Sequence, residues 1–384
     1  FGRFSVEVFT RVDRDVDLRR YDNDGPDGWP DSGDDDGFVD YVFINLKNIP
    51  YGFLVGRATG IGGLGLDYVS NDVGRDGIPI RVRGGIGYGA IQQENGFHLT
   101  AAVMAHEFGH GLGLPDLYDL YYSDPSEDSA GIGRWGLMGW GALGWNGSDG
   151  PNPLSAWSLE RLGWVSVDNG RLLKVTGDTT SVRLEPVRAG GAVVRLPLGG
   201  SEGAEYLLIE ERSRSSGYYD RALPAEGLLV WRVRADQRGN NSEHEKLVDL
   251  VCADGLYRDA GFPLGKRPDG RFGGDNLDFW SHDEAYRRSR GGNMGDATDP
   301  FGSDGVTRLH MGGNPSTLPK GSVSSAFTSL EMTMRRQGSE ISVDVALPRW
   351  AGTISEEILW TGQVWIDGDL RVAPEGRLSI AEGT

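Results

Sequence analysis

The segment His106–Asp116, which reads HEFGHGLGLPD, constrains this chain more than any other part of its sequence. Residues four positions apart lie on the same face of an α-helix, so His106 and His110 can direct their ring nitrogens at one metal ion. A histidine pair at this spacing, with a glutamate after the first histidine, is typical of catalytic zinc sites. The segment therefore predicts a helix that carries such a site.

The residues around the two histidines supply the other groups that a zinc site needs. Glu107 is one step round the helix, too far round to be a ligand, and is placed to accept a proton from a zinc-activated water as general base. Gly113 can adopt the left-handed conformation that ends a helix, after which the chain can turn back. Asp116 is then the expected third zinc ligand, with Asp119 and, from a later helix, Glu160 as alternatives.

Composition narrows the classes of protein that fit. The 384 residues carry a net charge of −18, which argues against nucleic-acid binding, because that requires clustered Lys and Arg. No apolar run approaches the roughly 20 residues of a membrane span. Cys252 stands alone, so no intrachain disulfide can form, and bound metal is one alternative source of stability. The chain begins at Phe1 without a signal segment, and we expect a processing or cloning boundary there.

Patterning in the first 165 residues predicts a mixed α+β domain. Phe4, Val6 and Val8 alternate with polar residues as in a strand, and YVFINL at 41–46 is typical of a buried central strand. The sequence GIGGLG at 60–65 matches a dinucleotide-binding pattern but lacks the helix that should follow, so we expect a loop. Helices are expected at 99–113 and 152–164.

From about residue 171 the period changes to two, which predicts an all-β, sandwich-like domain over 166–350. The alternating apolar residues are Leu229, Trp231 and Val233, then Leu330, Met332 and Met334, then Ile341, Val343 and Val345. A long polar segment at about 236–325, rich in Gly and Asp, is typical of functional loops or metal-bound structure. Residues 351–384 are expected to be the truncated start of a further β-rich module, similar to the opening turns of a parallel β-helix.

Acidic residues between 22 and 40 form a second candidate metal site. Glycines among them permit the tight turns that wrap oxygen ligands round a hard cation, and so many like charges repel one another without one. We therefore expect Ca²⁺ here, although neither half of the run matches the EF-hand template. Asp296 and Asp299 in GDATDPF are candidates for another such site. The expected calcium ligands in the acidic run are Asp22, Asp24, Asp27, Asp34, Asp36 and Asp40.

Three segments together resemble the immune inhibitor A-like family, secreted bacterial zinc metallopeptidases of the metzincin type. They are HEFGHGLGLPD, the downstream LMG turn at 137–139, and PNPLSAWSLERLGW at 151–164. Similar segments include DNDGPDGWPDSGDDDGFVDYV, EYLLIEERSRSSGYYDRALPAEGLLVWRV and GGNMGDATDPF, so the resemblance extends over most of residues 20–347.

The resemblance implies a metzincin-like catalytic domain over 1–165, with His106, His110 and Asp116 as zinc ligands and Glu107 as general base. It also implies that Met138 is the Met-turn residue beneath the metal. The chain departs from the family's relatives at Asp116, where most metzincins have a third histidine. Trp140 stands where some metzincins place a tyrosine that stabilises the oxyanion, so the sequence does not identify that group.

The sequence therefore predicts a secreted, zinc-dependent endopeptidase with structural calcium, acting on protein or peptide substrates. Location outside a bacterial cell follows from the resemblance alone. We expect substrate to pair as an extended strand with a sheet edge, and GYGAIQQ at 87–93 is the expected edge. One alternative is a calcium-stabilised adhesion or glycan-binding module with a vestigial zinc helix. The other is a thermolysin-like peptidase that uses Glu160 as the third ligand.

Overall fold

The computed structural model of the chain describes most of its 384 residues and separates them into two compact units. The first unit contains residues 1–115 and 142–151, and the second contains 116–141 and 152–384. This division differs from the three domains expected from the sequence, whose boundaries at 165 and 350 stay a prediction. The description leaves out residues 56–57, 122–128, 148, 176–177, 199–204, 242–245, 255–293, 304, 311–314, 316, 318–326, 329–330, 347–348, 356, 361–363, 381 and 383–384.

The first unit begins with helix α1 (Gly2–Val12), so the strand expected at residues 4–8 is wrong. The alternation of three apolar residues there is also compatible with a helical stripe, because Phe1, Phe4 and Val8 fall on one side at helical spacing. Phe9 is buried in the core of this unit, and Phe1 and Phe4 pack against that core. A segment this short fits both the strand period of two and the helical period of 3.6, and burial in the tertiary structure decides between them.

A three-stranded sheet forms the centre of the first unit, in the order β1 (Val42–Leu46), β5 (Ile86–Gln93), β2 (Gly60–Gly63). Strand β5 pairs with β1 in parallel and with β2 antiparallel. Two expectations are therefore wrong: the strand at 41–46 has one partner and is only partly buried, and GYGAIQQ is central rather than an edge. The expected loop at 60–65 contains strand β2. A hairpin of β3 (Tyr68–Val73) and β4 (Pro79–Val82) and a short 3₁₀ helix (Leu18–Tyr21) complete this part.

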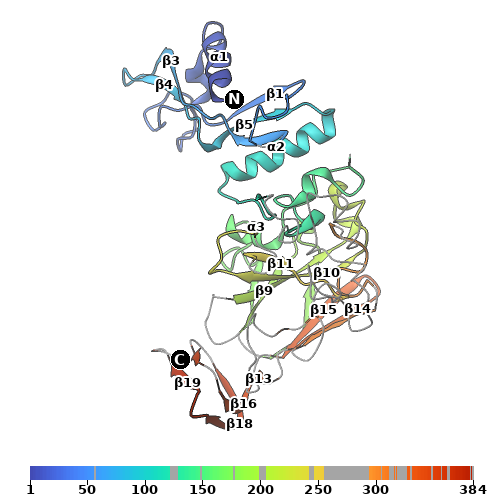
Figure 1. The fold of residues 1–384 in the computed structure, drawn as a ribbon. Helices are drawn as coiled ribbons and strands as arrows, with labels where there is room; N and C mark the ends of the chain where they lie inside the picture. The colour runs from blue at the N-terminus through green and yellow to red at the C-terminus, as the bar shows by residue number, and fades with distance from the viewer. Residues whose placement is uncertain are drawn as a thin grey trace. The chain divides into compact units, whose positions relative to one another are not determined.

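Helix α2 (Phe97–Gly111) lies along one face of this sheet (Figure 1). It fulfils the expectation of a helix at 99–113, with both ends two residues earlier. The opposite side of the unit holds an apolar core, and its buried members are Phe9, Leu18, Val39, Ile44, Leu54, Leu64, Tyr68, Ile80, Val82 and Ile91. The sheet therefore lies between two layers, the apolar core on one side and helix α2 on the other.

The second unit is built on two sheets that share one core. The five-stranded sheet has the order β11-β10-β9-β8-β6 and the four-stranded sheet the order β12-β14-β15-β7. Their strands are β6 (Leu172–Lys174), β7 (Thr179–Leu184), β8 (Val193–Pro197), β9 (Glu205–Arg212), β10 (Gly227–Arg234), β11 (Val248–Leu250), β12 (Arg308–His310), β14 (Glu331–Gln337) and β15 (Glu340–Ala346). The core draws residues such as Ile209 and Val230 from one sheet and Met332 and Val343 from the other, which is a sandwich-like arrangement.

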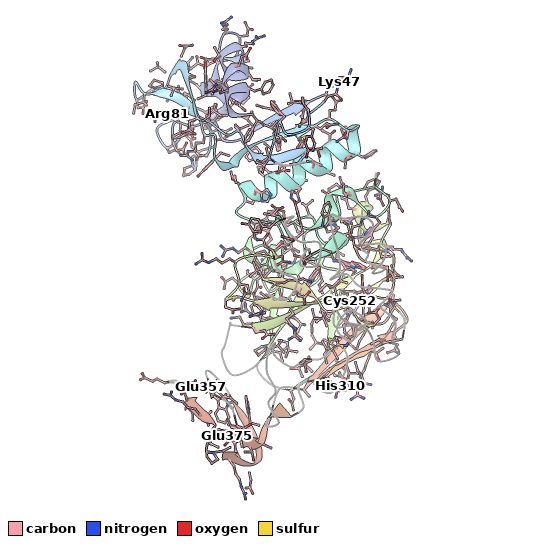
Figure 2. All side chains as sticks on the ribbon, viewed as in Figure 1. Lys47, Arg81, Cys252, His310, Glu357 and Glu375 are labelled. Atoms are coloured by element: carbon pink, nitrogen blue, oxygen red, sulfur yellow. The ribbon has the colours of Figure 1, made fainter. Side chains whose placement is uncertain are left out.

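Strand β10 departs from the half-buried pattern that the sequence predicts. Its seven residues from Gly227 to Val233 are all buried, so both faces of the strand are covered. Arg232, which lies between the alternating residues Trp231 and Val233, is buried and pairs with Glu205 at 2.8 Å. Figure 2 shows Cys252, a buried cysteine just beyond β11, in this same unit.

Helix α3 (Ala156–Arg161) is shorter than the helix expected at 152–164. Its N-cap is Ser155, whose hydroxyl accepts a hydrogen bond from the amide of Ser158 at 3.3 Å. A serine cap of this kind fixes where a helix begins. Short 3₁₀ helices cover Gly133–Trp135, Trp140–Leu143, Val187–Ala189, Arg214–Ser216 and Tyr218–Asp220.

The C-terminal residues contain β13 (Phe327–Thr328), β16 (Arg349–Ile354), β17 (Glu357–Trp360), β18 (Trp365–Val372) and β19 (Arg377–Ile380). Strand β16 pairs with β18 and β17 with β19, both in parallel. Parallel pairing between nearby strands is what the expected β-helix-like module requires. In the described part of the chain, no helix combines the length and the apolar content needed to cross a membrane.

Candidate metal centre

Helix α2 is fixed to the sheet of the first unit by side-chain hydrogen bonds. Gln92 of β5 is fully buried and donates from Nε2 to the carbonyl of Thr100 at 3.0 Å. The hydroxyl of Tyr41, which precedes β1, donates to the carbonyl of Glu107 at 2.9 Å. Burial and the nearby Glu107 carboxyl raise the pKa of Tyr41, so this hydroxyl stays protonated as a donor. The helix is thus held at both its first and its last turns.

The end of the helix follows the predicted glycine signal. Gly113 has φ +84°, and the amide of Leu114 donates to the carbonyl of Gly109 at 3.0 Å. A left-handed residue just past a helix closes its last turn in this way. No atom lies within 4 Å of where a Cβ of Gly113 would be, so the glycine is needed for its backbone conformation rather than for space.

His106 and His110 lie together on one face of α2, with ring centroids 5.1 Å apart. Nδ1 of His110 lies 2.8 Å from the carbonyl oxygen of Leu114. A carbonyl can only accept, so the proton of this imidazole resides on Nδ1 and Nε2 carries the lone pair that metal coordination needs. The helix C-terminus thereby orients one ligand ring, as outer hydrogen bonds do in metal sites.

Glu107 is buried beside these rings, with 6% of its surface exposed. Its Oε2 lies 4.0 Å from Nε2 of His110. A buried carboxylate at this distance can share a water with a metal ion held by the histidine without being a ligand itself.

Asp116 is the acidic residue that the structure groups with the two histidines. His106, His110 and Asp116 each offer one ligand atom, and these atoms lie within 4.8 Å of one another. Distances of this size suit three ligands of one zinc ion, since each bond is about 2.0–2.2 Å long.

The two alternative ligands are engaged elsewhere. Asp119 accepts a hydrogen bond from the amide of Tyr121 at 2.8 Å. Glu160 forms an ion pair with Arg195 of β8 at 2.6 Å and accepts from the hydroxyl of Tyr206 at 3.2 Å. The arrangement favours Asp116 over the thermolysin-like alternative.

Met138 is fully buried in a turn between two 3₁₀ helices, and its carbonyl accepts from the amide of Leu117 at 2.8 Å. The carbonyl of Leu117 in turn accepts from the amide of Ile132 at 3.0 Å and from Nδ2 of Asn240 at 3.2 Å. Asn240 is fully buried and also bonds the backbone of Val248 in both directions. The residue after Asp116 is therefore fixed to the turn that contains Met138. Its role as a Met-turn residue beneath a metal stays a prediction.

Three aspartates of the acidic run lie close enough together to share one cation. Asp22, Asp24 and Asp35 offer ligand atoms within 4.8 Å of one another, and Asp35 was not among the expected ligands. Asp22 is 2% exposed, and among the described residues its Oδ1 has no hydrogen-bond partner. Burial, followed by the charges of Asp35, Asp36 and Asp24, raises the pKa of Asp22 to about 6.

The other four expected calcium ligands lie outside this cluster, and their carboxylates accept hydrogen bonds. Asp27 accepts from the amide of Trp29 at 2.7 Å, and Asp34 accepts from the hydroxyl of Ser32. The remaining two, Asp36 and Asp40, accept respectively from the side chain of Arg83 at 2.8 Å and from the amide of Asn23 at 3.3 Å.

Asp296 and Asp299 serve a different purpose in the structure. Oδ2 of Asp299, which is fully buried, accepts from the indole of Trp135 at 2.6 Å and from the amide of Asp296 at 2.8 Å. No group of three potential metal ligands in the described residues includes either aspartate. Asp299 thus fixes the segment GRWGLMG, while Trp140 of the same region packs on Tyr118 with ring centroids 5.1 Å apart.

Sequence reasoning missed the glycines that face the site from strand β2. A Cβ placed on Gly60 or Gly62 would meet Glu107 or His110 closer than 3.0 Å. The signal was present as glycine at alternate positions in GIGG, but it could not be interpreted without knowing that a helix covers this strand.

Two comparisons relate the chain to known proteins. Residues 84–171 match the family model described as immune inhibitor A peptidase M6, catalytic domain. The chain is also 28% identical over 172 residues to the Pre-pro-metalloprotease PrtV of two Vibrio cholerae serotype O1 strains, M66-2 and ATCC 39315. That alignment covers 41% of this chain and 18% of the relative, so the chain spans a small part of the relative's length. No solved structure matches.

The residues that match the family model include the whole of helix α2. They therefore include both histidines, Glu107 and Asp116. Residues 84–171 are therefore similar to an immune inhibitor A peptidase catalytic domain, and the family resemblance seen in the sequence is confirmed.

Proposed function

We propose that this chain is a zinc-dependent endopeptidase that hydrolyses peptide bonds of proteins. The observation that carries the proposal is the grouping of His106, His110 and Asp116 within 4.8 Å, with the buried carboxylate of Glu107 beside it. Similarity to a metalloprotease and to a peptidase catalytic domain supports the same reaction class.

The donor set fits zinc. Two imidazoles and one carboxylate are a common ligand set of catalytic zinc, which keeps its fourth position for water or substrate. When bound, zinc lowers the pKa of water and polarises a carbonyl oxygen as a Lewis acid. A structural zinc site generally has four protein ligands and no need of an adjacent base, which separates this site from a vestigial one.

Glu107 is the general base in this proposal. It accepts a proton from the water whose oxygen attacks the scissile carbonyl carbon. It then passes that proton to the amide nitrogen, so that the carbon–nitrogen bond breaks and the amine leaves neutral. His110 keeps its proton on Nδ1, bonded to Leu114, throughout these steps.

Substrate is proposed to bind along β2 instead of along β5, which has partners on both sides. Within the described residues β2 pairs with β5 alone, so its other edge can accept an extended peptide by main-chain hydrogen bonds. The side chains of Glu107 and His110 lie against this strand, which brings a peptide on its edge close to the reacting groups.

Calcium is proposed to bind Asp22, Asp24 and Asp35. The buried Oδ1 of Asp22 has no protein partner among the described residues, and three carboxylates within 4.8 Å repel one another unless a cation lies between them. Such an ion stabilises the folded first unit and takes no part in the chemistry.

Export from a bacterial cell is proposed by analogy. The relative is named a pre-pro-metalloprotease, a term for a precursor with a leader and a propeptide.

The proposal is tested by measuring zinc content and casein hydrolysis for the wild type and for Glu107→Gln. We expect about one zinc per chain in both proteins and a loss of at least 10²-fold in activity in the variant, which is the usual contribution of a general base. Wild-type turnover in Glu107→Gln would refute the mechanism. A zinc-loaded wild type without peptidase activity would instead support the vestigial, binding-module alternative.

A further inference from the structure

Strand β2 presents a surface without side chains to helix α2. An ideal Cβ on Gly60 would lie 2.8 Å from Oε1 of Glu107 and 3.0 Å from Cγ1 of Val103. One on Gly62 would lie 2.9 Å from Cδ2 of His110 and 3.2 Å from Oε2 of Glu107. Both glycines have ordinary backbone conformations that any residue can adopt, so their small size is what the structure uses.

We infer that Gly60 and Gly62 are positioning residues for the proposed peptidase reaction, an inference that rests on the function proposed above. Gly60 sets the position of the Glu107 carboxylate, and Gly62 sets the position of the His110 imidazole. Each does so by letting the side chain lie directly against the strand backbone.

The helix cannot move back to relieve a larger residue at either position. Its backbone is bonded to Tyr41 at Glu107 and to Gln92 at Thr100. On its far turn, a Cβ on Gly111 would lie 2.8 Å from the ring of Tyr41, so that face is also closely packed. An added methyl group on β2 is therefore accommodated by displacement of the functional side chains.

The two displacements have different chemical consequences. The carboxylate of Glu107 is the end of a flexible side chain, so a methyl group at position 60 rotates it away from its place at little cost to folding. The ring of His110 is held by the bond from Nδ1 to Leu114. A methyl group at position 62 therefore strains either that bond or the orientation of Nε2, and outer interactions of this kind change metal affinity by about 10–100-fold.

The test compares Gly60→Ala and Gly62→Ala with Gly85→Ala, a control in the same unit but outside β2. The nearest atoms to a Cβ on Gly85 are 3.5 Å away and belong to the ring of Tyr88, not to the metal-site helix. The measurements on the full chain are zinc affinity by competition with a chromophoric chelator, thermal unfolding of the zinc-free protein, and kcat and KM with a peptide substrate.

We expect Gly62→Ala to lose about 10-fold or more in zinc affinity. Gly60→Ala should bind zinc like the wild type but lose about 10²-fold in kcat with little change in KM, because a misplaced base lowers only the chemical step. Gly85→Ala should match the wild type in zinc affinity and kcat.

Two results would overturn the inference. One is a wild-type zinc affinity in Gly62→Ala together with a wild-type kcat in Gly60→Ala. The other is equal losses in all three variants that follow their melting temperatures, since these would show a general packing effect. A wild-type chain that binds no zinc or cleaves no peptide would refute the proposed function itself, a result visible before any glycine variant is made.

Discussion

Glu211→Gln should stabilise the second unit at alkaline pH and change its stability little in acid. Glu211 lies on β9 and is 5% exposed. In a strand, alternate residues share a face, so its side chain points to the same side as Leu207 and Ile209, which belong to the sandwich core. Burying a carboxyl group in such a place costs little free energy when the group is protonated and much more when it is ionised.

The pKa of this group gives the magnitude. Burial, as the main cause, raises the pKa of Glu211 from 4.5 to about 7, and Arg336 opposes the rise. A rise of about 2.5 is equivalent to about 3 kcal/mol, since one pKa unit corresponds to about 1.4 kcal/mol. Because the folded pKa is the higher one, the favourable contribution of the neutral carboxyl is complete below pH 4.5 and is lost as the pH rises through about 7.

The assay is urea unfolding of the full chain in the Glu107→Ala background, which avoids autolysis, at about pH 5 and about pH 8.5. Glu211→Gln should raise the free energy of unfolding of the second unit by up to about 3 kcal/mol at the higher pH and by less than about 1 kcal/mol at the lower. Glu226→Gln is the matched control of opposite sign, because hydrogen bonds from Ser213 and Arg214 lower the pKa of Glu226. Equal stability of Glu211→Gln and its parent at pH 8.5 would refute the reasoning.

Three further predictions address the two proposed metal sites and helix α2. Asp116→Ala should lower zinc affinity at least tenfold while Glu160→Ala leaves it unchanged, as read by chelator competition; the reverse ranking would restore the thermolysin-like alternative. Asp35→Asn should reduce the rise in melting temperature that calcium produces whereas Asp27→Asn should not, and equal responses of the two variants would contradict the ligand set. Tyr41→Phe removes one hydrogen bond to the helix backbone and should lower the free energy of unfolding by about 1 kcal/mol in urea titrations; no loss would show that the bond is replaceable.

Local sequence signals foresaw the features that depend on neighbouring residues. The i, i+4 spacing of His106 and His110 put both rings on one face of a helix, and Gly113 ended it in the left-handed conformation that only glycine adopts without strain. The period of two foresaw strands β14 and β15 for the same reason, since alternation is a local property of an extended chain.

Features that depend on what packs against a segment could not be foreseen. The N-terminal segment satisfies a strand and a helix pattern equally, and burial of Phe9 selected the helix. Residues 87–93 have the composition of an edge strand but became central because β1 and β2 took both sides. In the acidic run, the path of the loop brings Asp35 close to Asp22 and Asp24. The carboxylate of Asp27 instead accepts a hydrogen bond from the amide of Trp29 in a local turn.

The sequence by itself determined which chemistry we propose for the chain, because the residues of the proposed metal site lie within eleven consecutive positions, from His106 to Asp116. Only the tertiary structure decided what holds those groups in place. Gly60 and Tyr41 are far from them in sequence and reach them through strand pairing and helix packing. The local sequence determines the identity and spacing of side chains, whereas the close approach of two backbones depends on every element that packs around them.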